Sequence, residues 1–150
     1  MTYNKGEYMR CNDISDWIVR YEHHVLIVEN SASRIDSFFR RYYIPDSRYY
    51  DFSQICSDSA TDRNDCAVSV VRDALNADEH VIIFNCVGWS DSGEGSAVSQ
   101  FAMIARKFGK QLIVAVSKKD APKIEPHFKT VGKLTGKDNI VVVSHARPEY

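Results

Sequence analysis

Glycine and proline are scarce in this sequence, with seven and four copies among 150 residues. Disordered chains are usually rich in such residues and poor in apolar ones, whereas 44% of this chain is hydrophobic. No apolar run approaches the length of about 20 residues that a membrane-spanning helix needs. The composition therefore predicts a folded, soluble chain without a membrane partner, of a length typical of one domain.

A clear excess of either charge is also absent. The chain has 19 basic and 20 acidic side chains, whereas nucleic-acid binders usually carry a basic excess to neutralise phosphates. The four cysteines, at positions 11, 56, 66 and 86, form no CxxC pair and have no histidine at zinc spacing. We therefore expect no nucleic-acid partner, no metal, no cofactor, reduced thiols and a cytoplasmic location.

Apolar runs alternate with helical patterns along the chain. The runs predict strands at residues 24–29, 48–52, 80–86, 111–117 and 139–144. Capping residues and apolar positions at helical spacing predict helices at residues 14–21, 31–42, 62–77, 97–108 and 122–134. This order predicts an α/β fold, a doubly wound, flavodoxin-like five-stranded parallel sheet in three α/β/α layers.

The domain organisation follows from the same pattern. We expect residues 1–22 to form an N-terminal tail with a short helix, and residues 23–150 to form a single domain. Ligands of open α/β sheets bind beyond the carboxyl ends of the strands, where the strand order reverses. In the flavodoxin-like order, that point lies between the first and third strands.

Polar and glycine residues are concentrated where these strands are expected to end. The candidate ligand-binding residues are Glu29, Asn30, Ser31, Asn85, Trp89, Ser90, Asp91, Ser92, Gly93, Glu94 and Ser117, with Lys118 directly behind Ser117. The same residue types also occur in ordinary strand-to-helix turns, so a binding site and a plain set of turns remain alternatives. None of these residues is predicted to be catalytic.

The loop at residues 87–96 is rich in glycine and serine and precedes an expected helix. Backbone amides at such a place can bind a phosphate. However, Glu94 stands where the P-loop pattern requires lysine, which argues against a Walker-type site. Cys86 lacks the arginine that a phosphatase loop requires, and we interpret it as a small buried residue.

Residues 25–31 (VLIVENS), followed by Arg34 and Phe38, resemble the opening of response-regulator receiver domains. The spacing of the expected strands agrees with that family over residues 24–144. The resemblance implies that Glu29 and Asn30 take the acidic-pair positions, Asn85 the phospho-acceptor position and Ser117 the switch position. Since asparagine cannot form an acyl phosphate, it implies a degenerate receiver that is not phosphorylated.

Residues 62–117 resemble the nucleoside 2-deoxyribosyltransferase-like group. The matching features are Arg63, Gly88-Trp89, the Ser90–Gly93 loop and Gly109-Lys110. Enzymes of this group attack the sugar with a helix-borne glutamate. That position is Ala97 or Ser99 here, and Glu94 in the loop is the nearby carboxylate.

Two hypotheses follow. The first is a non-catalytic, receiver-like signalling or protein-interaction domain, with another protein bound near Pro122, Pro126 and the tail to Tyr150. The second is a protein that binds a small nucleotide or nucleoside, or cleaves an N-glycoside, with Trp89 stacked on a base. A filled cleft at the strand ends favours the first and an open one the second, and homo-oligomers are compatible with both.

Overall fold

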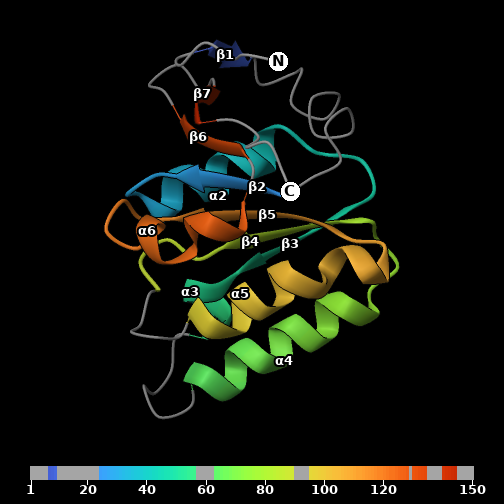
Figure 1. Ribbon diagram of the computed structural model, residues 1–150. Coiled ribbons are helices and arrows are strands. Elements are labelled where there is room, and N and C mark those ends of the chain that lie inside the picture. The colour runs from blue at the N-terminus through green and yellow to red at the C-terminus, as the bar shows by residue number, and fades with distance from the viewer. Residues whose placement is uncertain are drawn as a thin grey trace.

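The computed structural model describes residues 7–9, 24–56, 63–89, 95–128, 130–134 and 140–144. Its centre is a sheet of seven strands in the order β1-β7-β6-β2-β5-β4-β3 (Figure 1). The strands are β1 (Glu7–Met9), β2 (Val25–Val28), β3 (Ser47–Asp51), β4 (Val81–Asn85), β5 (Gln111–Val116), β6 (Thr130–Leu134) and β7 (Ile140–Ser144). The five strands from β6 to β3 are parallel.

Helices cover both faces of this sheet (Figure 1). They are α2 (Ala32–Arg41), α3 (Phe52–Ile55), α4 (Arg63–Asn76), α5 (Gly95–Ile104) and α6 (Ala121–Ile124), with the 3-10 helices η3 (Ala105–Phe108) and η4 (Glu125–His127). The predicted class is confirmed: the fold is α/β and doubly wound, and its architecture of five parallel strands in three α/β/α layers is flavodoxin-like.

The two faces of β2 show how the layers are built. Successive side chains of a strand point to opposite faces. Val25 and Ile27 therefore pack in the cluster that contains Phe38 of α2. Leu26 packs in the other cluster, beneath α4, α5 and α6, where Phe101 belongs.

The strand order differs from the flavodoxin-like order that we expected. After β2, the chain runs to the far edge strand β3 and returns through β4 to β5, so β5 lies between β2 and β4. The next connection crosses β2 to reach β6. From β2 the chain passes through α2, on one face of the sheet, to β3, and from β5 it passes through α6, on the other face, to β6. The direction in which strands are added therefore reverses between β2 and β5, the first and fourth parallel strands.

Two predicted segments are wrong, and a third is a strand as predicted but runs in the opposite direction. The helix expected at residues 122–134 ends with η4, and Thr130–Leu134 forms β6, the fifth parallel strand. The strand expected at residues 139–144 is β7, which runs antiparallel to β6. Glu7–Met9, expected in a tail, pairs with β7 as β1. The helix expected at residues 14–21 lies outside the described residues.

Two cysteines that we expected to be reduced are joined. Cys56 and Cys66 form a disulfide with a Cα–Cα distance of 5.7 Å. A spacing of ten residues gives no sign of such a bond, because it depends on how α3 meets α4. The inference of a cytoplasmic location loses the support that it took from reduced thiols. Within the described ranges, no helix is long and apolar enough to cross a membrane.

Candidate functional site

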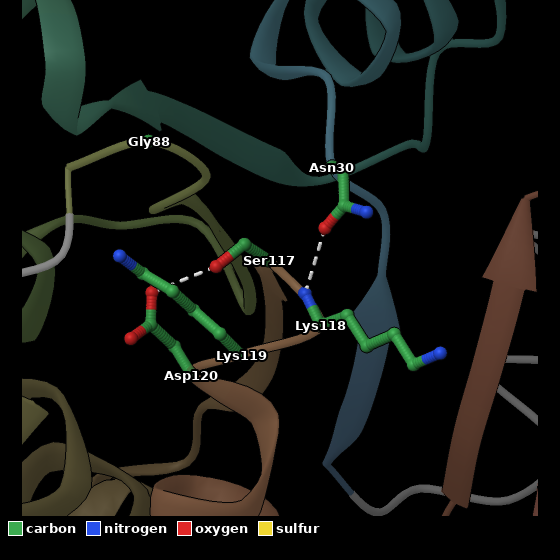
Figure 2. A pocket seen from close by; sticks show the side chains of 6 residues that line it. All are labelled: Asn30, Gly88, Ser117, Lys118, Lys119 and Asp120. Atoms are coloured by element: carbon green, nitrogen blue, oxygen red, sulfur yellow. Dashed lines mark hydrogen bonds between the residues drawn. The ribbon is translucent and has the colours of Figure 1, made fainter.

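A cleft of 760 Å³ opens at the carboxyl ends of the central parallel strands (Figure 2). It is lined by Asn30, Gly88, Ser117, Lys118, Lys119 and Asp120. These residues follow β2, β4 and β5, and the cleft therefore lies at the reversal of the strand order. This is the place where ligands of open α/β sheets bind.

The turn after β2 forms the first wall of the cleft. The Glu29 carboxylate accepts hydrogen bonds from Ser31 N at 3.1 Å and from Arg34 Nη1 at 3.1 Å. Ser31 begins α2, since its Oγ accepts a bond from Arg34 N at 3.2 Å. Glu29 and Ser31 are thus held within their own turn, and Asn30 is left exposed at the cleft.

The turn after β5 forms the second wall. The amides of Asp120 and Ala121 both donate to Ser117 O at 3.1 Å, and Ser117 Oγ bonds to Asp120 Oδ2 at 2.8 Å. These bonds fold the turn so that both lysines are exposed. Figure 2 shows the Lys119 side chain extending toward the Gly88 side of the cleft and the Lys118 side chain extending the opposite way.

Gly88 forms the third wall, after β4. Its φ of 79° lies in the left-handed region that glycine adopts without strain. A Cβ built on Gly88 would have no atom within 4 Å, so this position faces open space. The missing side chain contributes to the width of the cleft.

Asn85 does not reach the cleft. It is completely buried, and its Nδ2 donates to Ala32 O at 3.1 Å and to Tyr49 Oη at 3.0 Å. Its Oδ1 accepts a bond from Val87 N at 3.2 Å. Because β5 separates β2 from β4, Asn85 and Glu29 do not lie at the ends of neighbouring strands, and their expected place in a shared acidic cluster is wrong.

Burial also controls the titration of two groups near Asn85. Burial raises the pKa of the Tyr49 hydroxyl well above its usual value. Burial likewise raises the pKa of the Cys86 thiol, which is fully enclosed. A protonated and inaccessible thiol is a poor nucleophile, which agrees with the interpretation of Cys86 as a packing residue.

Trp89 lies in the core and not at the cleft. Its side chain is only 4% exposed, and its ring centroid is 5.0 Å from that of Phe52. The expected stacking of Trp89 on a base is therefore wrong for this conformation. The remaining loop candidates, Ser90, Asp91, Ser92, Gly93 and Glu94, lie outside the described residues.

The structure thus divides the predicted site. Asn30, Ser117 and Lys118 line the cleft, whereas Asn85 and Trp89 are buried away from it. Sequence reasoning missed Gly88, Lys119 and Asp120. Lys119 and Asp120 follow Ser117 directly, so the sequence offered a signal for them. That signal points to the cleft only when β5 is known to lie beside β2.

The fold and the cleft define a three-layer α/β domain with a ligand-sized opening at the reversal of its strand order. No protein-family model and no curated protein sequence matches the chain. A solved structure of Thermomonospora curvata EccC, its ATPases 2 and 3 in complex with a signal sequence peptide, is similar at 13% identity and a TM-score of 0.38. The similarity covers 85% of this chain and 37% of the EccC chain. At this level, it carries no conclusion about fold or function.

Proposed function

We propose that this domain binds a small phosphate-bearing ligand of the nucleotide class in the cleft, and that it acts through binding and not through catalysis. The observation that carries the proposal is the open cleft between the turns after β2 and β5. A pure protein-interaction module was expected to have this place filled. The volume of 760 Å³ lies within the range of about 300–1,000 Å³ that is usual for ligand pockets.

The charge of the lining favours an anion. Lys119 brings its positive charge toward the Gly88 side of the cleft, and Lys118, another lining residue, carries its charge the opposite way (Figure 2). Asp120 contributes one negative charge. The Asp120 carboxylate is already bonded to Ser117 Oγ, which reduces its repulsion of a bound anion. Lysine binds phosphate as a point charge and needs no bidentate geometry.

The position expected for a sugar-attacking glutamate supports binding over catalysis. Ala97 or Ser99 stands there, in α5, and neither carries a carboxylate. A protein partner fits the same proposal, because Pro122, Lys123 and Pro126 are exposed immediately after the turn that carries Lys119. A bound ligand would lie beside that surface, where it would change the contacts open to a protein partner.

The test is a thermal-unfolding titration with inorganic phosphate, nucleosides, nucleoside monophosphates and NAD. A ligand at a hundredfold excess over its dissociation constant should add about 2.7 kcal/mol to the free energy of unfolding. Nucleotides should stabilise the protein and nucleosides should do so much less. Lys119→Ala should weaken binding, whereas Lys123→Ala, an exposed lysine outside the cleft lining, should not. Unchanged melting with every compound would refute the proposal.

A further inference from the structure

The disulfide joins two helices at the edge of the sheet where the cleft opens. Cys56 follows α3, which begins directly after β3, and Cys66 lies in the first turns of α4. Cys56 is 4% exposed, whereas Cys66 is only partly buried. The bond is therefore approachable by a reductant from the α4 side.

The short helix α3 couples Cys56 to Phe52. The Cys56 amide donates to Phe52 O at 2.8 Å, which closes the single turn. At its start, the Asp51 carboxylate accepts bonds from Ser53 N at 3.1 Å and Ser53 Oγ at 2.7 Å. With both ends held, Cys56 and Phe52 belong to one rigid turn.

Phe52 in turn contacts the segment that forms the Gly88 wall. Its ring centroid lies 5.0 Å from those of both Phe84 and Trp89. Trp89 is the next residue after Gly88, and its amide donates to Cys86 O at 3.2 Å. A direct series of contacts thus runs from the disulfide through Phe52 and Trp89 to the cleft.

We propose that the Cys56–Cys66 disulfide is a redox-sensitive clamp that holds the Gly88–Trp89 turn, and with it one wall of the cleft. When the bond is intact, α3 is covalently linked to α4 and Phe52 stays packed against Trp89. When it is reduced, α3 is held only by its packing and its capping bonds, and the turn becomes looser. The effect on the ligand rests on the proposed function, whereas the effect on the turn does not.

The reduction needs a dithiol, either a small one or a dithiol protein. A thiolate of the dithiol attacks Cys66 Sγ, the sulfur–sulfur bond breaks, and Cys56 leaves as a thiolate that takes up a proton. The second thiol of the reductant then attacks the mixed disulfide and releases Cys66. Two electrons and two protons pass to the protein, and the dithiol becomes a disulfide. Cys86 does not exchange, because it is enclosed in the core.

The test follows the turn itself, using the full chain. Trp17→Phe leaves Trp89 as the single tryptophan, so its emission reports on the turn, and amide hydrogen exchange at residues 87–89 provides a second readout in the unmodified chain. Treatment with a dithiol should shift the emission and speed the exchange by about tenfold or more, as local opening does. The Cys56→Ser/Cys66→Ser variant should show both changes without a reductant. Cys11→Ser, which leaves the disulfide intact, should respond as the parent protein does.

Two results would overturn the clamp. One is the alkylation of all four cysteines in unreduced, denatured protein, which would show that the bond does not form. The other is unchanged emission and exchange after reduction has been verified by mass. A titration with inorganic phosphate in both redox states separates the two proposals. Absence of phosphate binding in both redox states counts against the proposed ligand but not against the clamp. Unequal phosphate affinities in the two states support the clamp, whereas equal affinities count against it.

Discussion

The side-chain oxygen of Asn30 accepts a hydrogen bond from the main-chain amide of Lys118 at 2.9 Å (Figure 2). It extends the pairing of β2 with β5, in which Val28 lies opposite Val116 and Glu29 N donates to Val116 O at 2.9 Å. The bond links two turns whose residues are 88 positions apart in the chain. It therefore fixes the separation of two walls of the cleft.

Asn30→Ala should remove this link. The loss of one exposed hydrogen bond should lower the free energy of unfolding by about 1 kcal/mol or less, as measured by urea denaturation. Asn30→Asp keeps an oxygen that can accept from Lys118 N, so it should remain close to the parent protein. Equal losses of stability in both variants would show that the side-chain oxygen at position 30 does not provide this stabilisation.

Asn85→Asp should be strongly destabilising. The new carboxylate cannot donate to Ala32 O or Tyr49 Oη, and an unpaired buried charge costs about 3–5 kcal/mol. The loss should be smaller at acidic pH, where a protonated carboxyl can donate again. Millimolar magnesium should not restore stability, because the side chain is completely buried. Selective rescue by magnesium would instead place this residue in an acidic site of the receiver type.

The Cys56→Ser/Cys66→Ser variant should lose part of its stability through the unfolded state. The disulfide spans a separation of ten residues, and closing a loop of this size stabilises a protein by about 2–3 kcal/mol in the chain-entropy treatment. Denaturation of the reduced parent protein should show the same loss. A difference in stability between the double variant and the reduced parent protein would be attributed to the serine side chains themselves.

Stability should fall in alkaline solution. Burial, followed by the hydrogen bond to Asp73, raises the pKa of Tyr50 from 10.0 to about 12. Since the folded chain holds this proton more tightly than the unfolded chain does, the contribution is complete below pH 10 and is lost as the pH rises toward 12. Tyr50→Phe should flatten this decline in denaturation experiments across that range. Tyr43→Phe is the matched control, because Tyr43 is 69% exposed.

Local patterns predicted most of the secondary structure. Apolar runs and helical spacing placed β2 to β5 and α2, α4 and α5 within a few residues, because these signals come from neighbours in sequence. Gly109 ends η3 with a φ of 73°, as expected for a glycine cap. The error at Thr130–Leu134 arose because this strand follows a short helix without a turn signal, so its residues appeared to continue the helix.

Non-local relationships could not be predicted in this way. The position of β5 beside β2 decides which turns form the cleft, and no apolar run records its neighbours. His24 shows the same limit, because its Nε2 bonds to Ala102 O at 3.0 Å and its Nδ1 accepts from Leu112 N at 3.0 Å. Both partners are distant in sequence. No local sequence pattern therefore reveals this structural role of His24.

The central place of β2 also has a consequence for how the chain folds. It is the first of the parallel strands to be synthesised, yet its two neighbours, β5 and β6, are the last. β1 can pair even later, since its partner β7 is synthesised after β6. Such pairing gives a high contact order, which slows folding. On the ribosome, β2 therefore remains an apolar segment with two unpaired edges until most of the chain has emerged, which is the period when nascent chains are most prone to aggregate.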